Sequence, residues 1–262
     1  MKRNGFLLAL LAVGFCACTE EAVNIPPPEE LAVVRQTREH PLKAAPNLSE
    51  KQIFSSPEYA LETTSSDWKV VSESDGVKTW QKAIQNSNVV AFRGESLIPA
   101  PLIKIATILN SDDLRKEWVE ALVEARTLEQ VSKSEQIEYN RTKAPWPLQD
   151  RDFVFRAKAY LGRKPTKVLI TIKSVEDSRA PPKDGVVRAE ILHCFYFMKE
   201  MDGGKNTKVV LEMAVDPKGA IPNWLMNLVQ KDWPKKTFRN LRKLAKRDDI
   251  RPTDEIREFF SK

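Results

Sequence analysis

Histidine, cysteine and glycine are scarce in this chain of 262 residues, which has two, three and nine of them. His40 lies in a proline-rich, charged segment, which leaves His193 as the one histidine in a patterned region. The sequence therefore offers no histidine pair and no histidine–cysteine metal cluster. Residues 201–205 (Met-Asp-Gly-Gly-Lys) indicate a hairpin turn rather than a phosphate-binding loop. We expect no metal, no other cofactor and no enzyme activity.

The first residues have the pattern of a bacterial export signal. Two basic residues precede an apolar run over residues 6–15, about half the length that a membrane-spanning helix needs. Of the two cysteines that follow, Cys18 is the better acylation site, because a small residue precedes it, whereas a bulky one precedes Cys16. We expect a signal peptide over residues 1–18 and an exported protein anchored through Cys18 in the outer membrane, facing the periplasm. The alternative is a cleaved signal and a soluble periplasmic or secreted protein.

The remainder of the chain indicates one folded domain. Prolines and charged residues dominate residues 19–47, which have little apolar periodicity and are typical of a tether. The divisions are a signal peptide at 1–18, a Pro-rich charged tether at 19–47, a domain at 48–250 and a C-terminal tail at 251–262.

Periodicity within the domain predicts strands and a few helices. Strands are expected at 68–72, 77–84, 89–98, 121–132, 134–143, 151–162, 166–176, 185–200 and 207–215. Helices are expected at 48–62, 99–109, 111–118 and 222–247. Alternation gives the later strands one apolar face each, carried by Phe153, Phe155, Ala157, Ala159, Val168, Ile170, Ile172, Val209, Leu211, Met213 and Val215. A closed hydrophobic core would explain this alternation as well as a cavity would.

Four segments, in order, resemble the START (StAR-related lipid-transfer) domains. They are Pro145–Val154 (P-W-P-L-Q-D-R-D-F-V), Arg115–Trp118 (R-K-E-W), Gly185–Glu190 (G-V-V-R-A-E) and Asp216–Leu225 (D-P-K-G-A-I-P-N-W-L). The resemblance covers about residues 50–247. It implies an α+β helix-grip fold, in which a curved antiparallel sheet surrounds a long C-terminal helix and encloses a hydrophobic tunnel for one lipid. It also places the loop at 174–185 over the tunnel entrance.

Two branches of this family are each half matched. In the sterol-handling branch, an acidic residue and an arginine pair inside the tunnel, and Glu138 and Ala157 stand at these positions. In the phosphatidylcholine branch, an arginine, an aspartate and an aromatic residue hold the headgroup, and Arg115, Val119 and Asn140 stand there. The resemblance thus implies a lipid or sterol-like ligand without selecting its headgroup.

Glu138 and His193 each allow two interpretations. Glu138 would need a cation, a water network or a ligand hydroxyl if it were buried, yet alternation with Ile137 and Tyr139 fits an outward polar face equally well. His193 lies between Ile191 and Phe195 on the more apolar side of its strand, where it could bind a ligand or be a satisfied core residue.

The site residues implied by the resemblance and the patterning form one set. They are Arg115, Trp118, Glu138, Asn140, Phe155, Ala157, Ile170, His193, Phe195, Leu211, Met213, Trp224 and Leu225. We expect a monomer that binds one lipid or sterol-like molecule and carries or senses it at the cell envelope. The alternatives are a helix-grip cyclase or hydrolase, with Glu138 and His193 as an acid–base pair, and a purely structural envelope lipoprotein.

Charge favours a membrane surface as a partner. The net charge is +6, from 42 basic and 36 acidic residues, and the basic residues are concentrated in the helix expected at 222–247. That helix also has an apolar stripe, so it could cover the tunnel and touch anionic headgroups. A solvated charged face is the simpler interpretation. An exported protein is not expected to bind nucleic acid.

Overall fold

The computed structural model describes residues 53–54, 67–84, 89–163, 166–219 and 223–261, with only the backbone for residues 223–232. The expected signal peptide, the tether and most of the helix at 48–62 lie outside these ranges.

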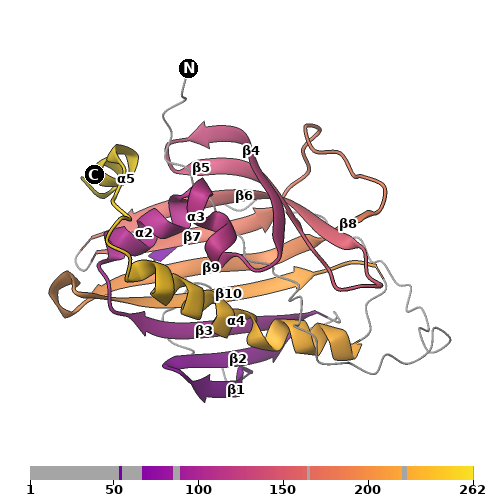
Figure 1. The fold of residues 1–262 in the computed structure, drawn as a ribbon, viewed down its shortest axis with the longest axis horizontal. Helices are drawn as coiled ribbons and strands as arrows, with labels where there is room; N and C mark the ends of the chain where they lie inside the picture. Colours follow the sequence, from indigo (N-terminus) through magenta and orange to yellow (C-terminus); the bar gives the residue numbers. More distant parts are fainter. Residues whose placement is uncertain (1–52, 55–66, 85–88, 164–165, 220–222, 262) are drawn as a thin grey trace.

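Ten strands and four α-helices make up the described domain (Figure 1). The strands are β1 (Lys69–Ser74), β2 (Val77–Ala83), β3 (Val90–Ile98), β4 (Leu122–Ser132), β5 (Glu135–Thr142), β6 (Asp150–Gly162), β7 (Lys167–Ser174), β8 (Val186–Arg188), β9 (Glu190–Met201) and β10 (Asn206–Asp216). The helices are α2 (Leu102–Asn110), α3 (Asp112–Trp118), α4 (Asn223–Ala245) and α5 (Asp254–Ser261), with a 3-10 turn, η3, at Asp202–Gly204. The Ser111 hydroxyl caps α3 by accepting from the Leu114 amide.

The strands form one curved sheet in the order β1-β2-β3-β10-β9-β7-β6-β5-β4 (Figure 1). All of these neighbours are antiparallel, and β8 lies off this path, paired in parallel with the start of β6. The prediction of one strand over 185–200 is therefore wrong. The chain leaves β6 at Ala189, whose amide donates to the Asp152 carbonyl at 3.0 Å, and it enters the centre of the sheet only as β9.

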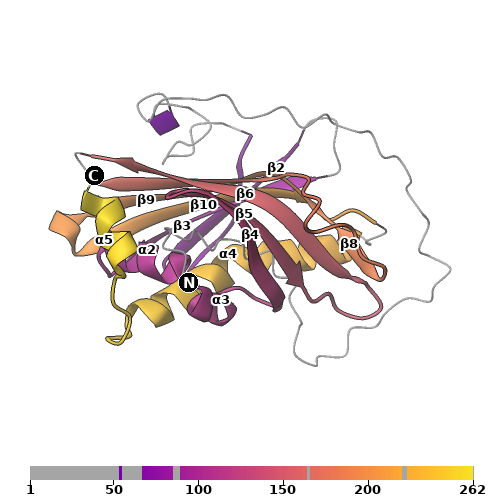
Figure 2. The ribbon, with the colours of Figure 1, turned by 90° about the horizontal axis from the view of Figure 1, so that it is seen from above.

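Helices α2, α3 and α4 lie on the same side of the sheet (Figure 2). The contact of α4 with β3 depends on Gly94, because a Cβ at this position would lie 2.7 Å from Cβ of Pro234. Pro234 stands within α4, and the helix continues through it. Arg242, two turns further on, donates to the Gly76 carbonyl at 2.7 Å and so ties α4 to the turn between β1 and β2. This architecture is the predicted α+β helix-grip fold.

The C-terminal segment is part of the folded domain. Helix α5 buries Ile256 and Phe259 in the main hydrophobic core, and Arg163 donates to the Phe260 carbonyl at 2.6 Å. Treating residues 251–262 as a tail was therefore wrong, because two apolar residues three positions apart are enough to dock one short helix.

Candidate ligand-binding site

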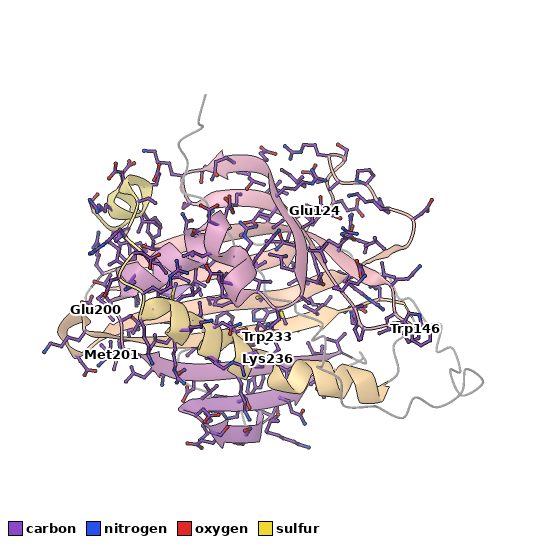
Figure 3. The ribbon with its side chains drawn as sticks, viewed as in Figure 1. Glu124, Trp146, Glu200, Met201, Trp233 and Lys236 are labelled. Carbon is purple, nitrogen blue, oxygen red and sulfur yellow. The ribbon has the colours of Figure 1, made fainter. Side chains whose placement is uncertain are left out.

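The inner face of the sheet, the face that α4 covers, is apolar over most of its area. It carries five of the expected wall residues, Phe155, Ala157, Ile170, Leu211 and Met213, all buried in one cluster. Trp118 of α3, together with Trp233 and Phe238 of α4, belongs to the same cluster. Figure 3 shows Trp233 near the middle of the molecule. Strand alternation alone brings the five sheet residues together.

A buried ion pair stands at the edge of this apolar face. Arg115 of α3 and Glu138 of β5 have side chains that are 2 % and 0 % exposed, and Nη1 of Arg115 donates to Oε2 of Glu138 at 2.7 Å. The other terminal nitrogen of Arg115 donates to Asp112, whose carboxylate is mostly exposed. Of the two interpretations of Glu138, the structure supports the inward one, with Arg115 as the cation.

The polar neighbours of Glu138 on β5 also point inward. Gln136 donates to Oε1 of Glu138, and Nη1 of Arg115 lies 3.5 Å from Oδ1 of Asn140. Ile137 and Tyr139 instead pack on the outer face of the sheet. Strand β5 thus places its polar side toward α3, where Arg115 binds it, and its apolar side outward, where it packs in a small hydrophobic cluster.

Several buried donors on the inner side of the sheet and on the helices α3 and α4 have no acceptor among the described residues. On α3 and β5 they are Nε of Arg115, Nε1 of Trp118 and Nδ2 of Asn140. On β9 and α4 they are the Tyr196 hydroxyl, Nε1 of Trp233 and the Thr237 hydroxyl. Burial raises the pKa of Tyr196 well above its usual value, so this hydroxyl remains a donor at any physiological pH. Sequence reasoning missed Tyr196, Trp233 and Thr237, because each of them is a common core or helix residue with no motif around it.

His193 and Phe195 lie on the outer face, so their assignment to the tunnel wall was wrong. Strand β9 has a bulge opposite Ala214 and Val215, where His193 and Ile191 pair with consecutive residues of β10. The extra residue, Leu192, reverses the alternation, and Ile191 shares the inner face with Cys194 instead. Nε2 of His193 lies 3.3 Å from Oε1 of Glu212, and its ring contacts Phe195 edge-on.

Three other expected positions cannot be placed. The side chains of Trp224 and Leu225, and the whole of Cys18, lie outside the described residues.

Arg151 and Asp152, from the most conspicuous motif of the sequence, are structural. The Arg151 guanidinium donates to the carbonyls of Gln149, Pro217 and Lys218 at 2.6 to 3.4 Å. Asp152 accepts two hydrogen bonds from Arg188 at 2.7 and 3.1 Å. These contacts join the start of β6 to β8 and to the segment that leads into α4.

The loop at 174–185 is anchored on the outer face of the sheet, away from α4. Ala180 is fully buried against Ile137, Tyr139 and Val154, and its carbonyl accepts from Arg188 at 3.0 Å. Burial, reinforced by the nearby Asp152 carboxylate, raises the pKa of the Tyr139 hydroxyl to about 12. Helix α4 is the element that covers the inner face (Figure 2). The placement of this loop over a tunnel entrance stays a prediction.

Within the described residues, no group of three or more histidine, cysteine or acidic side chains could hold a metal ion. Burial raises the pKa of the Cys194 thiol, which keeps it protonated and unreactive.

The family of the chain follows from its sequence. Residues 60–247 match the family model described as START domain, so the chain belongs to the START family. Phosphatidylcholine transfer protein of Mus musculus is 27% identical over 172 residues, which are 64% of this chain and 79% of that protein.

Solved structures agree with this fold. Human StAR-related lipid transfer protein 5 matches with a TM-score of 0.64 and 20% identity, over 69% of this chain and 87% of that one. The STAR-related lipid transfer protein from Xanthomonas axonopodis matches with a TM-score of 0.59 and 23% identity, over 69% of this chain and 99% of that one.

Proposed function

We propose that this protein holds one lipid molecule between the inner face of the sheet and α4, and carries or senses it at the cell envelope. The observation that carries the proposal is the buried Arg115–Glu138 pair on a mostly apolar face, together with buried donors that have no acceptor among the described residues. Acyl chains or rings would be held by burial of apolar area, at about 25 cal/mol per Å². The polar groups would orient the headgroup.

Leu211→Trp tests the interior position of the lipid. Leu211 is fully buried beside Gly94, under α4. In a site that admits a lipid, the larger ring takes space that the ligand needs, so lipid recovered with the purified protein falls several-fold while the melting temperature of the stripped protein changes little. In a filled core the same change overpacks and costs about 1 to 3 kcal/mol. Native mass spectrometry and thermal unfolding of the same preparations distinguish the two results, and destabilisation without ligand loss would contradict the proposal.

The outer side of α4 supports docking on an anionic membrane. Arg239, Lys243 and Lys246 are exposed, lie three or four residues apart and form no ion pair with a described residue. Residues 233–247 include no acidic side chain. Each cation near such a surface contributes about 1 kcal/mol of attraction.

Replacing these three cations with glutamine should slow lipid transfer to anionic vesicles by about tenfold. Attraction that depends on charge is screened, so the defect should shrink at high salt. Replacing Lys69 of β1, Lys199 of β9 and Lys205 after η3 removes the same charge outside α4 and serves as the matched control. Equal effects of the two triple variants would show that net charge, rather than the α4 face, is what matters.

Trp146 also supports docking on a membrane. It is 83 % exposed on the turn before β6, and Figure 3 shows it at one end of the molecule. Arg151 ties the strand that follows this turn to the segment that leads into α4. Tryptophan favours the membrane–water interface, so Trp146→Ala should weaken vesicle binding without lowering stability.

None of the described helices is long and apolar enough to cross a bilayer.

We propose that the domain is exported and attached through an acylated Cys18. Cys18→Ser should abolish labelling by a fatty-acid probe and release the protein into the periplasm, while Cys16→Ser should not. Labelling of Cys18→Ser at the wild-type level would contradict the anchor.

We also propose that the protein is not an enzyme. The acid–base pair that an enzyme could have used is divided by the sheet, since Glu138 points to the inner face and His193 to the outer one. Incubation with a lipid extract should return the lipids unchanged, and the appearance of a new product would overturn this view.

A further inference from the structure

The six donors named above have no acceptor among the residues that the structure describes, and they restrict the chemistry of the ligand. Each of them is an N–H or O–H group that needs an acceptor, and each of the six residues is nine-tenths or more buried. A buried donor without an acceptor is unfavourable, and native proteins seldom leave one. Six such donors, on α3, β5, β9 and α4, therefore point to a ligand that brings acceptors.

Four of these donors lie on α3 and α4. Nδ2 of Asn240 donates to the Trp118 carbonyl at 3.4 Å, which fixes the side of α4 that faces α3. Thr237 and Trp233 lie one and two turns before Asn240 on that same side. Arg115 and Trp118 are one turn apart on α3, so the donors of both helices are directed at the same part of the interior.

The charges of this region are already balanced. Arg115 donates to Glu138 and Asp112, and both carboxylate oxygens of Glu138 accept a hydrogen bond. A phosphate that formed an ion pair with the terminal nitrogens of Arg115 would compete with Glu138, and a ligand cation held by the oxygens of Glu138 would compete with Arg115. A charged headgroup would therefore have to break this buried pair or remain without a partner, and both are costly.

We propose that the ligand is an uncharged acyl-ester lipid of the diacylglycerol type, whose ester carbonyls accept from the donors on α3, α4 and β9. This proposal rests on the proposed function and specifies its ligand class. The hydroxyl of such a lipid can donate to Oδ1 of Asn140, which lies beside Arg115.

A panel of lipids with the same oleoyl or oleyl chains tests the proposal on the full mature chain. The panel contains dioleoylglycerol, dioleoyl phosphatidylcholine, dioleoyl phosphatidate and dioleyl glycerol, the diether that lacks both carbonyls. Competition measured by native mass spectrometry should favour dioleoylglycerol at least tenfold over both phospholipids and several-fold over the diether. Preference for either phospholipid, or equal binding of the ester and the ether, would overturn the ligand class while leaving lipid binding intact. Failure to bind any lipid would instead remove the proposed function.

Two variants test the donors themselves. Thr237→Val and Tyr196→Phe keep shape and remove a hydroxyl, so each should lower the affinity for dioleoylglycerol about three- to tenfold and leave the diether unaffected. The stripped Thr237→Val protein should melt at the same or a higher temperature, because an unpaired buried hydroxyl is gone.

Thr207→Val is the matched control, since the Thr207 hydroxyl already donates to the Ala100 carbonyl at 2.7 Å. It should lower the melting temperature without changing the preference for ester over ether. If the two variants of the unpaired hydroxyls leave that preference unchanged, these donors do not contact the ligand and the proposal fails.

Discussion

Arg115 and Arg151 are buried to the same degree, at 2 % and 1 % exposure, yet their surroundings differ. The Arg151 guanidinium donates through all three nitrogens to backbone carbonyls of two loops. Arg115 donates only to side chains, from three different residues, and its Nε has no acceptor among the described residues.

This difference separates a structural arginine from one that belongs to a site. Carbonyls held by the fold give Arg151 a fixed role in joining β6 to the segment before α4. Burial lowers the pKa of Arg151, and the negative charge of Asp150 opposes this shift. Side chains converge on Arg115 and leave its Nε without an acceptor among the described residues, which is the arrangement that the proposed ligand would complete.

The largest expected effect comes from breaking the Arg115 pair. Glu138→Leu leaves a buried cation without its main partner and should lower the free energy of unfolding by about 3 to 5 kcal/mol. Adding Arg115→Met should restore most of this loss, because an apolar pair of similar volume is often neutral. Urea unfolding of the single and double variants measures both steps.

The double variant also separates stability from binding. We expect it to fold and to lose its preference among lipid headgroups. A stable double variant with the wild-type preference would show that Arg115 is as structural as Arg151.

Arg151→Met should cost less, about 2 to 3 kcal/mol, because the partners left behind are neutral carbonyls, some of which water can reach. No second side-chain substitution can restore the loss, since the acceptors are backbone groups. Lipid preference of the folded fraction should remain that of the wild type. Recovery of stability by a companion substitution, or a changed preference, would remove the distinction between the two arginines.

The sequence predicts regular elements of this fold well and fails at single-residue irregularities. Strands expected at 68–72, 77–84 and 89–98 correspond to β1, β2 and β3, because clear turn residues separate these three segments. The bulge at Leu192 has no such signal, and it moved His193 and Phe195 to the opposite face. A single inserted residue reverses every later assignment in a strand, since alternation has a period of two.

The candidate site was harder to predict, because its polar side chains point into the domain rather than toward solvent. Gln136, Glu138 and Asn140 have the pattern of a wet face, and only their packing against α3 shows that they point inward. Thr237 and Tyr196 are recognisable as site residues only by their lack of partners, which depends on three-dimensional contacts. The motif at Arg151, which identified the family, marks the structural arginine and not the site.

A third arginine, Arg179, extends the comparison to the surface and gives the smallest predicted effect. It donates to Oδ1 of Asp177 at 2.8 Å, to the carboxylate of Glu129 at 2.6 Å and to the Leu128 carbonyl at 3.1 Å. These bonds fasten the loop at 174–185 to β4. Chiefly by this hydrogen bonding, Arg179 lowers the pKa of Asp177 from 3.8 to about 2.

This shift predicts how the contribution of Asp177 depends on pH. A carboxyl group whose pKa is lower in the folded state stabilises the fold above its unfolded pKa, and the stabilisation is lost as the pH falls through the folded value. Asp177→Asn should therefore lower the free energy of unfolding by about 1 kcal/mol at pH 6, because the arginine is largely exposed to solvent. The difference from the wild type should shrink between pH 4 and pH 2, as measured by urea unfolding across that range. Glu176→Gln, at the neighbouring exposed position, is the control and should change little at any pH. A difference between Asp177→Asn and the wild type that persists at pH 2 would mean that the side chain acts through its shape rather than its charge. Asp177 would then resemble Arg151, whose partners are neutral carbonyls that do not titrate.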